Sequence, residues 1–167
     1  MRRGILRWRH VQRCRALLAQ LKAPRYFDVK ELCRLVGECE GRPIVTSAMS
    51  LAVIGVSGLW LRGRTTDYVC YEQDTSVTHQ THIILHELGH IVFGHRGLTR
   101  EFEDLFTHLN DATLKMMLSR RHAEFSSRQE AEAETFAYVA GGRIKDPFAA
   151  VQERQEPFDR IRRLLET

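Results

Sequence analysis

Residues 78 to 93 read T-H-Q-T-H-I-I-L-H-E-L-G-H-I-V-F, and this stretch decides the fold. Its apolar residues, Ile84 and Leu88 among them, recur at the spacing of an α-helix. The stretch D-T-S at residues 74 to 76 offers N-caps before it, and Gly94 offers a stop after it. The sequence therefore predicts a largely apolar, buried helix around which the other elements are arranged.

This helix carries the motif H-E-x-x-H, formed by His86, Glu87 and His90. On a helix, His86 and His90 lie one turn apart, so both imidazoles project from one face at a separation that a tetrahedral Zn²⁺ accepts. Glu87 lies beside them, where a carboxylate can take a proton from a water molecule that the metal activates. Because three fixed positions alone are a weak signal, the helical context carries the prediction of a zinc-dependent peptidase.

A catalytic zinc ion needs a third protein ligand, and the nearest histidine is His95. The extended motif H-E-x-x-H-x-x-G-x-x-H would require Gly at 93 and His at 96, whereas the chain has Phe93 and Arg96. On a regular helix, His95 would lie about 140° around the axis from His90. We therefore expect His95 at the rim of the site or supporting a ligand, able to hydrogen bond a substrate carbonyl or oxyanion.

A second helix is predicted at residues 126 to 141, which contain no helix breaker before the glycine pair. Glu130 and Glu134 share one face of it, alongside small residues that would let it approach the first helix closely, opposite Gly89. Glu130 is the predicted third ligand. Glu134, one turn further on, is predicted to hydrogen bond a ligand imidazole and to fix its tautomer.

Other interpretations of these acidic and histidine residues stay open. Ser127 to Glu130 fits S-x-x-E, a capping box in which Glu130 would serve only its own helix. Glu132 points to another face of the helix and is expected to be solvated. His82, one turn before His86, is near enough to line the cleft. The remaining candidates, His79, His108 and His122, are expected to be structural or on the surface.

Together these residues resemble the ImmA/IrrE family of zinc metallopeptidases. The resemblance extends over about residues 28 to 140 and includes H-E-L-G-H at 86 to 90 and the strand-like D-Y-V-C-Y-E at 67 to 72. It also includes E-A-E-A-E-T-F-A at 130 to 137, which is similar to the family's E-x-E-A-N-x-F-A pattern. Glu134 stands where the family usually has Asn or Asp.

The resemblance implies a gluzincin-like endopeptidase with the ligands His86, His90 and Glu130, the base Glu87 and the cofactor Zn²⁺. It also implies that the substrate is a helix-turn-helix transcriptional repressor, whose cleavage switches on genes of stress response or mobile elements. A different class stays open: a regulatory or toxin-like binding protein that keeps the zinc site but acts by association with a protein or DNA partner.

The chain of 167 residues, 43% of them hydrophobic, is long enough for one core, so residues 1–167 are predicted to form a single metallopeptidase-like domain. Short strands are predicted at residues 42 to 46, 58 to 61 and 67 to 72, the last two joined by a hairpin at 62 to 66. Further helices are predicted at 101 to 118 and about 158 to 165. The expected fold is α+β, with a small three-stranded sheet packed on a helical, zincin-like core.

The N-terminal region is basic and contains no acidic residue before Asp28. Its basic side chains are Arg2, Arg3, Arg7, Arg9, Arg13, Arg15, Lys22 and Arg25. An apolar stripe at helical spacing runs through it: Ile5, Trp8, Val11, Cys14, Leu17, Leu18 and Leu21. We predict an amphipathic helix at about residues 4 to 22 with a solvated basic face, rather than a nucleic-acid site, since the net charge is only +4. Direct nucleic-acid binding is not expected, although this face could contact nucleic acid or an acidic partner.

The four cysteines, Cys14, Cys33, Cys39 and Cys70, form no C-x-x-C pair and are expected to be buried thiols. A second zinc site at Cys33 and Cys39 would have poor ligand spacing. Residues 43 to 61 carry no charge, but Pro43 and the glycines within them disfavour a membrane span. With no secretory signal and reduced cysteines, the expected location is the cytoplasm. The sequence predicts no oligomeric state.

Overall fold

The computed structural model describes residues 2–95, 125–145 and 163, and within them the chain has an α+β fold. Its elements, in order, are α1 (Arg2–Gln20), α2 (Val29–Glu40), β1 (Ile44–Met49), the short 3₁₀ helix η1 (Leu51–Ile54), β2 (Gly58–Arg62), β3 (Asp67–Glu72), α3 (Val77–Val92) and α6 (Ser127–Gly141). The helices predicted at 101 to 118 and about 158 to 165 lie outside the described residues.

The three strands form one mixed sheet in the order β1-β3-β2. The central strand β3 pairs in parallel with β1 and antiparallel with β2, so that Val69 lies opposite both Thr46 and Trp60. The predicted β2–β3 hairpin is confirmed, and Gly63 donates its N–H to the Thr66 carbonyl at 2.9 Å. Strand β1 begins at Ile44 rather than Arg42, because Pro43 has no N–H to donate to a ladder.

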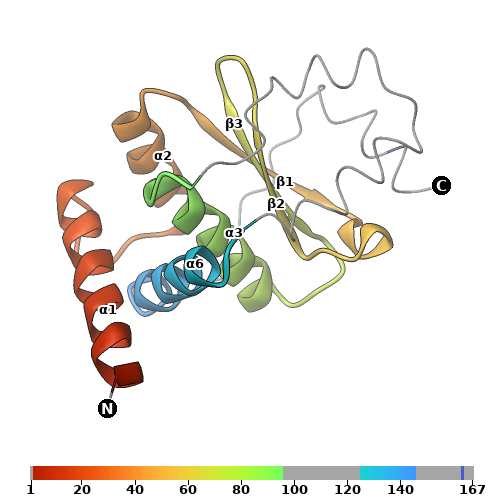
Figure 1. The fold of residues 1–167 in the computed structure, drawn as a ribbon. Helices are drawn as coiled ribbons and strands as arrows, with labels where there is room; N and C mark the ends of the chain where they lie inside the picture. The colour runs from red at the N-terminus through yellow and green to blue at the C-terminus, as the bar shows by residue number, and fades with distance from the viewer. Residues whose placement is uncertain (1, 96–124, 146–162, 164–167) are drawn as a thin grey trace.

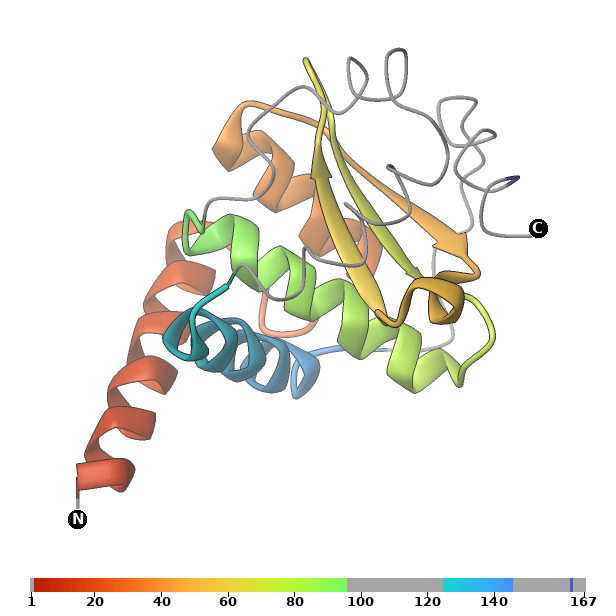
Figure 2. The same ribbon diagram turned by 45° about the vertical axis from the view of Figure 1, so that its right-hand side comes forward.

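Helix α3 is the predicted central helix, and its ends are formed by the predicted residues. The Ser76 side chain accepts a hydrogen bond from the His79 N–H, and Gly94 follows the helix with a left-handed φ of 65°. Figure 1 and Figure 2 show α3 between the sheet on one side and α6 on the other, and α1 in turn packs against α6. Helix α3 therefore contacts α2, α6 and two strands of the sheet, β2 and β3.

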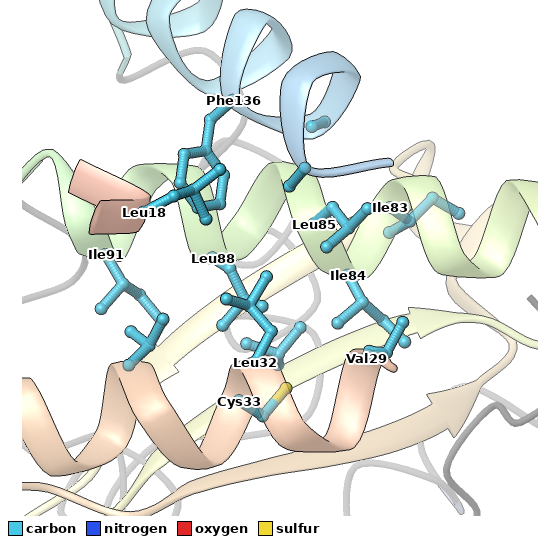
Figure 3. Packing of buried hydrophobic residues seen from close by; sticks show 14 of the residues in the cluster. Leu18, Val29, Leu32, Cys33, Ile83, Ile84, Leu85, Leu88, Ile91 and Phe136 are labelled. Carbon is cyan, nitrogen blue, oxygen red and sulfur yellow. The ribbon is translucent and has the colours of Figure 1, made fainter. Parts of the chain in front are cut away.

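Apolar side chains from three other helices, on two opposite sides of α3, hold it in this position. Figure 3 shows Phe136 of α6 and Leu18 of α1 on one side of α3, and Leu32 of α2 on the opposite side beneath Leu88. These four side chains are fully buried, and each contributes about 1.5–3 kcal/mol by leaving water. The histidine-bearing face of α3 is thus fixed by packing on its other faces.

Helix α1 is confirmed as an amphipathic helix, but its apolar stripe is only partly buried. Cys14, Leu18 and Leu21 are buried in the core, whereas the Trp8 side chain is 63% exposed. Figure 2 shows why: the first turns of α1 extend past α6, its packing partner. Trp8 therefore belongs to the apolar stripe in the sequence but is not packed in the core.

Gly89 is the point of closest approach between α3 and α6. A Cβ atom at this position would lie 2.9 Å from the Ala133 Cα and 3.0 Å from the Ala133 carbonyl oxygen, both backbone atoms that cannot swing aside. The prediction that small residues of the second helix lie opposite Gly89 is confirmed.

Replacing Gly89 with Ala should therefore destabilise the fold, despite the better helix propensity of Ala, by about 1–3 kcal/mol of overpacking. Urea unfolding curves would measure the change. Gly141→Ala is the matched control, because a Cβ at this position would make an ordinary 3.7 Å contact with Leu85. The Gly141→Ala protein should be as stable as the wild type or more stable. A Gly89→Ala protein as stable as the wild type would contradict the close packing.

All four cysteines are free thiols, and Cys14, Cys33 and Cys70 are buried as predicted. Burial raises the pKa of Cys33 to about 12 and that of Cys14 to about 11. Cys39 is exposed, contrary to expectation, because it lies off the buried stripe of α2. Within the described part of the chain, no helix has both the length and the apolar character needed to cross a membrane.

Candidate metal centre

Three side chains from α3 and α6 bring their donor atoms together. The Nε2 atoms of His86 and His90 are 3.1 Å apart. The Glu130 carboxylate places Oε2 at 3.3 Å from His86 Nε2 and Oε1 at 3.7 Å from His90 Nε2. One donor atom from each residue lies within 4.8 Å of the others, so the group could hold a metal ion; it is the one such group found in the described residues.

Glu130 is available for this group because the cap of α6 uses other residues. Ser126 is the N-cap, its side chain accepts from the Gln129 N–H, and the Gln129 side chain accepts from the Ser126 N–H at 2.9 Å. The alternative capping box from Ser127 to Glu130 is therefore wrong by one residue. Glu130 lies in the first turn of α6 and directs its carboxylate towards the two imidazoles.

The surroundings of the three donors fit a cation. Oε1 of Glu130 is buried and makes no hydrogen bond in the structure, which is costly for a carboxylate oxygen. The two facing Nε2 atoms could hydrogen bond only if one carried a proton, whereas a metal ion would accept lone pairs from both. Two imidazole nitrogens and a carboxylate oxygen are the donor set of many catalytic zinc sites.

The Glu134 carboxylate lies beside the outer ring nitrogen of His86. Its Oε2 is 3.4 Å from His86 Nδ1 and 3.1 Å from His82 Nε2. If Nε2 of His86 binds a metal ion, Nδ1 carries the proton and can donate it to Glu134. This is the placement that the sequence predicts for Glu134, and it also puts His82 next to the site.

His95 and Glu132 are buried beneath the site, at 7% and 4% exposure. The Nδ1 atoms of His95 and His90 are 2.9 Å apart, and His95 Nε2 lies 3.1 Å from Glu132 Oε2. Gly94 causes this placement, because its left-handed turn folds the chain back and brings the His95 N–H onto the His90 carbonyl. His95 therefore contacts His90 from beneath, which is the second of the two placements expected for it, and does not lie at the rim. The expectation that Glu132 is solvated is wrong.

Burial and hydrogen bonding set the protonation of this pair. Burial lowers the pKa of His95, and the hydrogen bond with Glu132 offsets only part of that effect. Burial alone would raise the pKa of Glu132, but hydrogen bonds from His95 and Arg128 and the charge of Arg13 outweigh it and lower the pKa. A neutral His95 beside an ionised Glu132 is the expected state at neutral pH.

Glu87 is 4% exposed and lies where α3 passes over the start of β2. A Cβ at Gly58 would come within 2.7 Å of Glu87 Oε1 and 2.5 Å of Ile83 Cγ2, so only glycine leaves room for the carboxylate in this position. The sequence analysis did not single out Gly58; the signal for it was a glycine at the first position of a strand, which often marks a close approach.

A groove of about 840 Å³ adjoins the site between α1, α3 and α6. Val11 and Arg15 of α1 form one wall, and His82 and Tyr138 belong to the others. Tyr138 is 72% exposed. Because His82 both lines this groove and contacts Glu134, the groove reaches the edge of the site, although none of the three donor residues lines it.

Comparison with protein-family models, with curated proteins and with solved structures found no match to this chain in any of the three. The function of the site must therefore be argued from its geometry and from the motif that builds it.

Proposed function

We propose that this protein is a zinc-dependent endopeptidase of the ImmA/IrrE type with a zincin-like core. The convergence of His86, His90 and Glu130 on one point carries this proposal. The same helix supplies a buried carboxylate, Glu87, next to the first of these ligands. A binding protein that used zinc only structurally would have no need of this carboxylate, since structural sites are closed by four protein ligands.

The three donors leave one coordination position for water or substrate, as catalytic zinc sites do. Bound there, zinc would supply Lewis acidity, which polarises a peptide carbonyl and lowers the pKa of water. Copper and nickel also bind imidazole and carboxylate, so the choice of zinc rests on this donor set and on the peptidase motif.

Each residue of the site has a separate task in this proposal. Glu87 takes a proton from the attacking water and gives it to the departing amine. Its packing against Gly58 limits the conformations of the carboxylate. Glu134 holds the His86 ring in one tautomer, and His95 does the same for His90.

The substrate that follows from the family resemblance is a helix-turn-helix repressor in the cytoplasm. The groove between α1, α3 and α6 offers space next to the site for side chains of a protein substrate. One wall of this groove, α1, contains no acidic residue and carries Arg15 at the groove itself, which suits a substrate segment with acidic side chains.

Metal removal tests the proposal directly. The purified protein should contain about one zinc ion per chain by elemental analysis, and it should cleave members of a proteome-derived peptide library as detected by mass spectrometry. Treatment with a chelator should abolish cleavage, and zinc should restore it where magnesium does not. His86→Ala removes a proposed ligand and should lower both the zinc content and cleavage. His79→Ala is its control, because His79 lies at the exposed start of the same helix, and it should change neither. Bound zinc without any cleavage would favour the binding-protein alternative, and cleavage that persists without metal would overturn the proposal.

A further inference from the structure

A chain of side chains connects the metal-binding group to the N-terminal helix. It runs from His90 through His95 to Glu132, whose other oxygen, Oε1, lies 3.1 Å from Nη1 of Arg13 in α1. Only the last of these side chains is substantially exposed. The chain therefore passes from α3 through α6 to α1 across the interior of the protein.

Each link has one donor and one acceptor if His90 directs Nε2 at a metal. His90 then donates from Nδ1–H to His95 Nδ1, His95 donates from Nε2–H to Glu132, and Arg13 donates to Glu132. If instead His95 were reversed in tautomer, two N–H groups would face each other at the 2.9 Å contact between the Nδ1 atoms. With a metal at His90, the hydrogen bonds along the chain from Arg13 to His90 therefore allow only one set of tautomers for His95 and His90.

Arg13 is the member that belongs to α1. Its guanidinium pairs with Glu132 and also lies 4.7 Å from the centre of the Phe93 ring, in the turn before His95. Arg128 also contacts Glu132, at 3.4 Å, but it comes from α6 itself and its side chain is 76% exposed. Of these two arginines, only Arg13 joins a different helix to the chain.

We propose that Arg13 and Glu132 are positioning residues that couple the docking of α1 to metal binding at His90. When α1 is docked, Arg13 holds the Glu132 carboxylate in place. Glu132 in turn orients His95, and His95 orients the ring of His90 so that it binds metal most tightly. By reciprocity, bound metal strengthens the docking of α1 by the same factor. The inference rests on the metal centre of the proposed function but not on its peptidase activity.

Zinc affinity measured by competition with a chromophoric chelator tests the first half of the coupling. Glu132→Gln should weaken zinc binding by about 10–100-fold, the range seen for residues that support a metal ligand. Arg13→Gln should weaken it several-fold, and Arg13→Lys, which keeps the charge, should recover most of the loss. Arg9→Gln is the matched control, because Arg9 is an exposed arginine of the same helix. The zinc affinity of Arg9→Gln should equal that of the wild type.

Hydrogen exchange tests the reciprocal half and separates coupling from simple destabilisation. Zinc should slow amide exchange in α1 of the wild type and of Arg9→Gln, and it should do so much less in Arg13→Gln. Cys14 and Leu18 still pack α1 against the body, so we expect Arg13→Gln to remain folded, and circular dichroism would verify this.

The outcomes distinguish this inference from the proposed function. If the wild type binds zinc tightly and Arg13→Gln binds it equally well, with the same protection of α1, the coupling is wrong while the metal centre stands. If the wild type binds no zinc, the metal centre itself is wrong and the coupling falls with it.

Discussion

Replacing Glu87 with Gln should abolish peptide cleavage and leave the zinc content unchanged. The amide has nearly the same shape as the carboxylate and fits the same space against Gly58, but it cannot accept a proton from water. Loss of a general base lowers rates by about 10²–10⁴-fold. Single-turnover cleavage of the best library peptide and zinc analysis of the same sample would measure both quantities.

The matched control for this variant is Glu38→Gln. Glu38 is an exposed glutamate of α2 that pairs with Arg34 on its own helix, so its replacement should change neither zinc content nor cleavage. Two results would contradict the role of Glu87. Unchanged cleavage would remove it as the base, and loss of zinc together with activity would mean that its buried carboxylate supports the fold or the ligands instead.

Replacing Glu130 with Gln should strip the protein of most of its zinc. A structural zinc site of four protein ligands binds with about 10–16 kcal/mol, so one ligand accounts for about 2.5–4 kcal/mol, or about 10²–10³-fold in affinity. The neutral amide keeps the size of Glu130 but loses the charge that attracts the cation. Chelator competition would give the affinity, and loss of cleavage should follow in proportion to the loss of metal.

Two other variants of α6 test whether the effect of Glu130→Gln comes from the loss of a metal ligand or from a general change at the N-terminal half of the helix. Glu134→Gln should weaken zinc by no more than about 10–100-fold, because Glu134 contacts the ring of His86 and not the donor cluster. Ser127→Ala should have no effect, because the cap is built by Ser126 and Gln129. If Glu130→Gln kept its zinc and Glu134→Gln lost it, Glu134 would become the third ligand.

The parts of the fold that depend on local sequence could be predicted. Periodicity and end signals identified α3, its cap at Ser76 and the stop at Gly94, because these depend on neighbours in the chain. The β2–β3 hairpin is likewise a contact between adjacent segments. The prediction of Glu130 as third ligand rested on its spacing within α6, on the need for a third ligand and on the resemblance to the ImmA/IrrE pattern.

The part that Glu132 and Arg13 play in supporting His90 could not be predicted, because it depends on contacts between residues distant in sequence. The place of His95 is set by the turn at Gly94, which makes its angle on a regular helix irrelevant. From its position on α6 alone Glu132 was expected to be solvated, but its carboxylate is buried against His95 and against Arg13 of α1. The sequence shows His95 and Glu132, but it does not show which side chains they contact in the folded chain.

Helix α2 was absent from the predicted elements although its ends carry recognisable signals. Asp28 accepts a hydrogen bond from the Glu31 N–H at 2.7 Å, and Gly41 ends the helix with a left-handed φ of 66°. The buried face of α2 includes Val29, Leu32 and Val36 at helical spacing. The aspartate before this segment, the glycine after it and the apolar spacing between them are together sufficient to predict the helix.

The close contact between Gly89 and Ala133 has a thermodynamic consequence for the metal centre. Because backbone packing sets the crossing of α3 and α6, the donors on the two helices are brought together by folding itself. Such a preorganised site does not spend binding free energy on ordering the chain, unlike small zinc domains that fold only when metal binds. The protein should therefore keep its fold when metal is withdrawn and bind metal again without refolding, so that the activity proposed for it would follow the zinc supply reversibly.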